Sequence, residues 1–77
     1  MTFDSFLDKF KEQLMEDDPS IVKAGTKFRD LDSWDSLTGM AIITMIEDEY
    51  GVKINEATFK SFKTVEDVYN YVASQKV

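Results

Sequence analysis

The residues best suited to chemistry lie in a short motif, Asp35-Ser36-Leu37, which opens an apolar-rich stretch ending at Tyr50-Gly51. This pattern predicts a helix that begins at Asp35 or Ser36 and has Gly51 just beyond its end. Backbone N–H groups in the first helical turn lack helical partners, and the helix dipole there favours a negatively charged group such as phosphate. We therefore interpret Ser36 as a covalent attachment point. The alternative is that Asp35 or Ser36 only caps the helix.

Composition argues against a self-contained active site. The chain has 77 residues, which predicts a single domain spanning residues 1–77 with one small core. It has no cysteine, so disulfides, thiolate zinc sites and cysteine nucleophiles are excluded. It also has no histidine, the usual general base and the commonest metal ligand. We expect no enzyme here, but a substrate, a carrier or a binding partner.

The charge balance bears on the class of partner. A net charge of −6 argues against nucleic acid, whose binding depends on neutralising phosphates. The same charge suits basic surfaces on partner proteins. No apolar run reaches membrane-spanning length, and the N-terminus does not resemble a signal peptide. We expect a cytoplasmic monomer that does not insert into membranes.

Three acidic residues before the helix raise a metal-binding alternative. Asp30, Asp32 and Asp35 alternate loosely with other residues, as in a calcium loop. The glycine and the distal glutamate of an EF-hand are missing at the right spacing. A metal-binding regulator is therefore the last of our hypotheses, and we predict no metal site.

The stretch before the motif predicts one helix and a long loop. Apolar residues at helical spacing form a single stripe from about Thr2 to Glu16, which Thr2 or Asp4 would cap: Phe3, Phe6, Leu7, Phe10 and Leu14. Asp17-Asp18-Pro19-Ser20 should stop this helix, because proline disfavours helix at and before its own position. The loop that follows should be anchored by Ile21, Val22 and Phe28, with a turn at Gly25-Thr26-Lys27.

Two faces of the helix after Ser36 differ in character. The inward face should carry Ile42, Ile43, Ile46 and Tyr50, with Gly39 on the same side. A second face, next to Ser36, carries Leu37, Met40, Thr44, Glu47 and Asp48. Apolar residues on such a surface, methionine among them, are typical of a docking site for partner proteins.

The remaining sequence predicts a short helix and a final longer one. Val52 and Ile54 should return to the core, and Asn55 should cap a brief helix through Phe59. Phe62 should anchor the next loop, and Thr64-Val65-Glu66-Asp67 resembles a capping box. The last helix should bury Val65, Val68, Tyr69 and Val72 with Tyr71 beside them, and should fray at Gln75-Lys76-Val77. The predicted fold is all-α: a small four-helix bundle with three longer helices, one short helix and a long loop between the first two.

This order of elements, with Asp35-Ser36-Leu37 at the start of the second helix, resembles the acyl carrier protein family. The resemblance covers nearly the whole chain. It is carried by the motif after a long loop, the acidic balance, the Glu47-Asp48-Glu49-Tyr50-Gly51 helix end and the core positions Ile42, Ile46, Tyr50 and Ile54.

The resemblance implies a carrier that bears 4′-phosphopantetheine on Ser36, flanked by Asp35 and Leu37. A phosphopantetheinyl transferase would donate this arm from coenzyme A, and acyl groups would then be held on it as thioesters. Acyl- or aminoacyl-transferring enzymes with basic patches would dock on the second helix, at Leu37, Met40, Thr44, Glu47 and Asp48. An acyl chain would be sheltered near Ile43, Ile46, Ile54, Phe59 and Val68.

Some residues depart from the fatty-acid type of the family. Thr38, Ala41 and Thr44 replace a more acidic surface, and Trp34 is larger than the usual small residue. Trp34 either shields the arm, contacts a partner or packs the loop onto the core. The pathway stays open between fatty-acid or polyketide synthesis and a stand-alone aminoacyl, D-alanyl or peptidyl carrier. A further alternative is an acidic helical interaction module without a prosthetic group.

Overall fold

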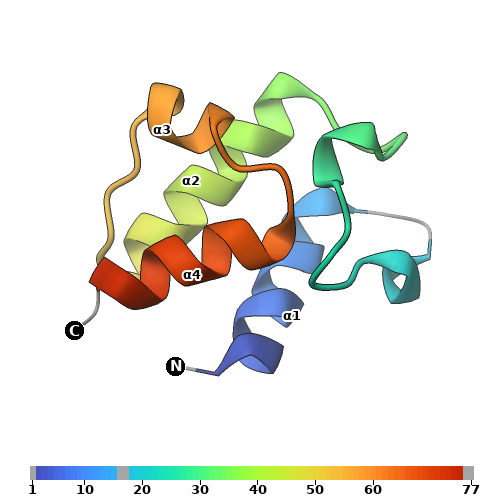
Figure 1. Ribbon diagram of the computed structural model, residues 1–77. Coiled ribbons are helices and arrows are strands. Elements are labelled where there is room, and N and C mark those ends of the chain that lie inside the picture. The colour runs from blue at the N-terminus through green and yellow to red at the C-terminus, as the bar shows by residue number, and fades with distance from the viewer. Residues whose placement is uncertain (1, 16–17, 76–77) are drawn as a thin grey trace.

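Four α-helices form the body of the protein. The computed structural model describes residues 2–15 and 18–75. The helices are α1 (Phe3–Leu14), α2 (Ser36–Tyr50), the short α3 (Glu56–Lys60) and α4 (Val65–Gln75). Helix α1 packs against both α2 and α4, while α3 lies at the far side of α2 from α1 (Figure 1). The predicted all-α fold with three longer helices and one short helix is confirmed.

Side-chain caps set where the helices begin. Thr2 Oγ1 accepts a hydrogen bond from the backbone N–H of Ser5 at 3.2 Å, which fixes the start of α1. Asn55 Oδ1 accepts one from the backbone three residues later at 2.7 Å and opens α3. At α4, Thr64 Oγ1 accepts from the backbone of Asp67 at 3.2 Å, and Asp67 Oδ2 accepts from that of Thr64 at 3.1 Å. This reciprocal pair confirms the predicted capping box.

The helix ends agree with the prediction for α2 and differ for α1. Gly51 follows α2 with a φ of 69°, the left-handed conformation that glycine adopts readily. Helix α1 ends at Leu14, because Met15 is left-handed with a φ of 53°. The predicted end at Glu16 was too late, and Glu16 itself lies outside the described residues.

The long loop between α1 and α2 contains two 3₁₀ turns, Pro19–Ile21 and Phe28–Asp30. Val22 and Phe28 are fully buried, as predicted, but Ile21 is 47% exposed and is not an anchor. The two adjacent side chains differ in direction: Val22 faces the core, whereas Ile21 is largely exposed to solvent. The predicted turn falls slightly earlier, where Thr26 N–H donates to the Lys23 carbonyl at 3.1 Å.

This loop is tied to the start of α4. An isolated antiparallel bridge joins Lys27 to Thr64. Beside it, the Glu66 N–H donates to the Ala24 carbonyl at 2.9 Å. The loop therefore reaches the motif at Ser36 from a fixed position against the last helix (Figure 1).

One hydrophobic core holds the bundle together. Its fully buried members come from every longer helix and from the loop, and include Phe6, Phe10, Leu14, Phe28, Ile42, Ile46, Val65, Val68 and Val72. Met45, which the sequence pattern did not place inside, is also buried. Tyr50, Tyr69 and Tyr71 pack against the core edge. None of the helices in the described part of the chain is long and apolar enough to cross a bilayer.

Candidate functional site

Ser36 is the first residue of α2, and its side chain is exposed. Asp35 is the N-cap: its Oδ1 accepts hydrogen bonds from Thr38 N at 2.7 Å and from Thr38 Oγ1 at 2.9 Å. The sequence left open whether Asp35 or Ser36 caps the helix, and these hydrogen bonds decide between them. Asp35 does the capping, and the Ser36 hydroxyl takes no part in it.

The cap lowers the pKa of Asp35 below its ordinary value of 3.8. The backbone N–H of Thr38 is the main cause, followed by its hydroxyl, because both donate to the charged form of the carboxyl group. The carboxylate thus contributes stability above pH 3.8, and this contribution is lost as the pH falls through the lowered pKa.

Replacing Asp35 tests this assignment. We expect Asp35→Ala to lower the melting temperature at neutral pH by a few degrees, because α2 loses its cap. Asp35→Asn keeps an acceptor oxygen but has no titrating group, so its melting temperature should depend less on pH below 3.8 than that of the wild type. Thermal unfolding followed by circular dichroism measures both. Equal melting temperatures for wild type and Asp35→Ala would show that the cap is not used.

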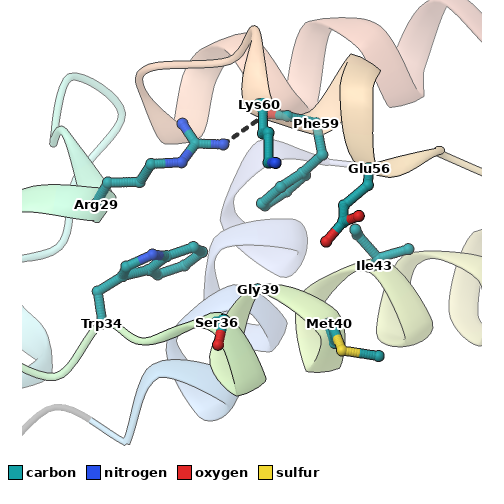
Figure 2. Close-up of a pocket in the computed structure, with 9 residues that line it drawn as sticks. All are labelled: Arg29, Trp34, Ser36, Gly39, Met40, Ile43, Glu56, Phe59 and Lys60. Atoms are coloured by element: carbon teal, nitrogen blue, oxygen red, sulfur yellow. Dashed lines mark hydrogen bonds between the residues drawn. The ribbon is translucent and has the colours of Figure 1, made fainter.

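A pocket opens beside Ser36, between the start of α2 and α3 (Figure 2). Its volume is about 140 Å³. Trp34 and Phe59 face one another across it, and Ser36 lies at its rim with the hydroxyl directed away from the rings (Figure 2). The complete lining is Arg29, Trp34, Ser36, Gly39, Met40, Ile43, Glu56, Phe59 and Lys60.

Trp34 packs the loop onto the core and forms one wall of this pocket. Its ring stacks on Phe59 at 6.2 Å between centroids, with 16° between the planes, and contacts the buried Phe28 at 5.0 Å. Gly39 on α2 allows this packing, because a Cβ there would lie 3.2 Å from Trp34 Cζ2. The helix-interior glycine, which costs roughly 1 kcal/mol relative to alanine, is thus explained by the close approach of the indole ring.

Arg29 braces the aromatic wall, and sequence reasoning missed it. Its guanidinium carbon lies 4.9 to 5.9 Å from the ring centroids of Phe28, Phe59 and Trp34. Its nitrogens donate to the Phe62 carbonyl and, at 2.7 Å, to the Phe59 carbonyl. The one signal in the sequence was that this is the only arginine of the chain and that it follows Phe28.

The residues predicted for partner docking lie on one exposed surface next to Ser36. Leu37 is 74% exposed and Met40 is 61% exposed, and because they lie three positions apart on a helix they are neighbours on its surface. Thr44, Glu47 and Asp48 continue this surface along α2 and are exposed too. Glu47 also lies 3.9 Å from Lys53 Nζ, a solvent-exposed ion pair of small energetic weight.

The residues predicted to shelter a cargo divide into two groups. Ile43 and Phe59 line the pocket beside Ser36, and Ile43 and Ile54 line a more open hollow next to it. Ile46 and Val68 are fully buried in the core instead. The calcium hypothesis is not supported, because the described residues, Asp30, Asp32 and Asp35 among them, form no acidic group able to hold a metal ion.

Comparison with known proteins identifies the family. The model of the phosphopantetheine attachment site matches residues 4–72. The acyl carrier protein of Aster yellows witches'-broom phytoplasma is 31% identical over 72 residues, which cover 94% of this chain and 93% of the relative. That of Phytoplasma australiense is 38% identical over 60 residues, or 78% of each chain. Acyl carrier protein 2, chloroplastic, of Hordeum vulgare is 32% identical over 95% of this chain and 56% of its own length. The chain belongs to the acyl carrier protein family, whose members carry phosphopantetheine.

Proposed function

We propose that Ser36 is the residue that bears the phosphopantetheine arm, and that the protein presents acyl groups on this arm to partner enzymes. The observation that carries the proposal is the position of Ser36 as an exposed first residue of α2, capped by its neighbour Asp35. The sequence supplies no cysteine. When attached, the arm supplies the thiol on which a carrier holds its cargo as a thioester.

Attachment is a substitution at phosphorus that leaves the protein fold unchanged. Ser36 Oγ attacks the phosphorus atom that bears the pantetheine part of coenzyme A, and a new O–P bond forms. The bond from this phosphorus to the adenosine bisphosphate breaks, and the serine proton leaves through a base of the transferase. We assign no proton transfer to Asp35, because the hydrogen bonds from Thr38 lower the pKa of its carboxyl group and make the carboxylate a weaker base. Its place in the reaction is to fix the start of α2 and hence the position of Ser36.

The surroundings of Ser36 fit such a group. A phosphodiester on Ser36 Oγ would lie at the positive end of the α2 dipole, an interaction worth roughly 0.3–1 kcal/mol at an exposed site. The mostly apolar pocket begins at the same residue, with Trp34, Met40 and Ile43 among its walls. Arg29 is committed to backbone carbonyls and rings, so it is not the counter-ion of the phosphate.

Partner enzymes are proposed to dock on the α2 surface formed by Leu37, Met40, Thr44, Glu47 and Asp48. The exposed apolar side chains of Leu37 and Met40 can pack against a partner. At the other end of the surface, the carboxylates of Glu47 and Asp48 suit a basic patch on that partner. The chain would serve fatty-acid, polyketide or related synthesis. The names of the relatives favour an acyl cargo over an aminoacyl or D-alanyl one.

Charge reversal tests the docking surface. We expect Glu47→Lys combined with Asp48→Lys to slow association with a basic partner enzyme roughly tenfold at low salt, and less at high salt. Turnover against carrier concentration, measured at two ionic strengths, gives this effect. Asp8→Lys combined with Glu12→Lys, at two exposed positions of α1, changes the net charge by the same amount; it is the matched control and should leave the rate unchanged. A rate that is insensitive to the α2 reversal would place docking elsewhere.

The attachment itself is tested by mass spectrometry of the intact protein. After incubation with coenzyme A and a broad-specificity transferase, the mass should rise by one phosphopantetheine, and fragmentation should place the added mass on the peptide containing Ser36. No gain with several transferases would count against the carrier function. The exposed Leu37 and Met40 would then favour an interaction module that binds its partner without an arm.

A further inference from the structure

The short helix α3 has few contacts of its own to hold it in place. It consists of Glu56–Lys60, and a helix of one turn is not stable in water by itself. Phe59 is the one buried side chain among these five residues, all of which the structure describes. Carbonyl groups at the end of a helix also lack helical partners and need donors from elsewhere. The position of α3 therefore depends on contacts from other parts of the chain.

Arg29 supplies such contacts from the loop between α1 and α2. Its guanidinium donates to the Phe59 carbonyl at 2.7 Å and to the Phe62 carbonyl, so it bridges the end of α3 and the turn that follows (Figure 2). The negative end of a helix dipole favours a cation at this place. The backbone of Arg29 is held by its neighbour Phe28, which is fully buried. One side chain thus joins a fixed loop to a weakly held helix.

The same guanidinium also connects α3 to Trp34, the residue before Asp35. Its carbon atom lies 5.2 Å from the ring centroid of Phe59 and 5.9 Å from that of Trp34. The two rings stack on each other, with 6.2 Å between their centroids. Because the hydrogen bonds of Arg29 are partly buried, these contacts between cation and ring are partly shielded from water and gain strength. Loss of Arg29 would therefore loosen α3 and the indole ring together.

We propose that Arg29 is a latch: its two hydrogen bonds hold α3 and Trp34 against the core, and when they break, both are released together from an otherwise folded bundle. Local opening of this kind is typical of segments with few buried contacts. Asp35 caps α2 independently of the latch, so Ser36 keeps its place when the latch opens. Under the proposed carrier function, on which this use of the latch rests, opening changes the wall beside the arm without moving the attachment point.

NMR relaxation of the backbone amides in the apo protein tests the latch. In Arg29→Ala, we expect the order parameters of Lys60 and Phe62 to fall below about 0.6, whereas those of Ile46 and Val72, in the middle of α2 and α4, stay near about 0.85. Arg29→Lys should change them in the same direction but less, because an ammonium group lacks the planar fork that reaches both carbonyls. Order parameters in α3 that stay near about 0.85 in Arg29→Ala would overturn the latch.

Lys27→Ala is the matched control, because it removes an exposed cation from the same loop. It should leave every order parameter unchanged. The emission of Trp34, the single tryptophan of the sequence, should shift to longer wavelength in Arg29→Ala but not in Lys27→Ala. A mobile α3 with unchanged Trp34 emission would refute the joint release.

A measurement on the wild type keeps the test decisive if Arg29→Ala does not fold. Arg29 is the only arginine of the sequence, so its guanidinium signals are assigned without ambiguity. Two hydrogen bonds to carbonyls should slow rotation of the guanidinium and give separate, slowly exchanging N–H signals. A single averaged signal, as in a free side chain, would overturn the latch.

Attachment of the arm is a separate readout. Intact mass after transferase treatment should show complete attachment in Arg29→Ala, because Asp35 still caps α2. Loss of attachment in this variant would overturn the independence of Ser36 from the latch. If the wild type accepts the arm but α3 does not depend on Arg29, the latch fails and the carrier function stands. If the wild type never accepts the arm, the carrier function fails, and the latch is decided by the signals of the apo protein.

Discussion

Ser36→Ala is expected to abolish phosphopantetheine attachment completely, with no change in the fold. The substitution removes the only oxygen at the first position of α2 that can form the O–P bond. Because Asp35 and not Ser36 caps the helix, and alanine is the best helix former, the free energy of unfolding should stay within about 0.5 kcal/mol of the wild type. Intact mass after transferase treatment and thermal unfolding measure the two effects.

Ser33 and Thr38, two hydroxyl-bearing residues near Ser36, supply the controls. Ser33→Ala changes a serine in the same loop and should leave attachment complete. Thr38→Ala removes a hydroxyl one turn into α2, whose hydrogen bond goes to Asp35, and should reduce stability slightly while attachment proceeds. An arm-sized mass gain that survives Ser36→Ala would refute the site. A loss of attachment that also follows from Ser33→Ala would point to damage in the loop instead.

The helix boundaries were largely predictable because they depend on local chemistry. Thr2, Asp35, Asn55 and Thr64 each cap the helix that follows them, and each carries the residue type that its cap requires. Gly51 ends α2 for the same kind of local reason. The motif at Ser36 was also readable in the sequence, since its position depends on the cap and not on distant contacts.

What the sequence did not predict depends on contacts between distant segments. Arg29 reaches the carbonyls of Phe59 and Phe62, about thirty positions later, and no local pattern indicates such a partner. The choice between Ile21 and Val22 as the loop anchor also depends on where the loop meets the core. The pocket is itself a product of these contacts. Its lining became clear only once Trp34 was placed over Gly39.

Phe28→Ala is expected to have the largest effect on stability, a loss of about 3–5 kcal/mol. The ring of Phe28 is fully buried, and its centroid lies 5.3 Å from that of Phe10, 5.0 Å from that of Trp34 and 5.7 Å from that of Phe59. Its removal therefore leaves a cavity at the junction of the loop with the core. Native proteins in general have only about 5–15 kcal/mol of stability. Urea unfolding followed by circular dichroism should show a greatly lowered midpoint.

The conservative change Phe28→Leu is the control, since leucine refills much of the space; it should cost roughly 1–2 kcal/mol. Phe62→Ala removes a half-buried ring at the edge of the same cluster and should cost less than Phe28→Ala. A loss below about 1 kcal/mol for Phe28→Ala would mean that the loop is not anchored through this ring.

The same variant should separate the attachment site from the pocket. Ser36 depends on the Asp35 cap, which Phe28 does not contact, so Phe28→Ala that remains folded should still accept the arm. The pocket, in contrast, depends on Phe28 as the support beneath Trp34 and Phe59, and Arg29 lies against all three rings. The emission of Trp34, the single tryptophan of the sequence, should therefore shift to longer wavelength in Phe28→Ala while attachment remains complete. Equal Trp34 emission in the variant and the wild type would show that the aromatic wall does not depend on Phe28.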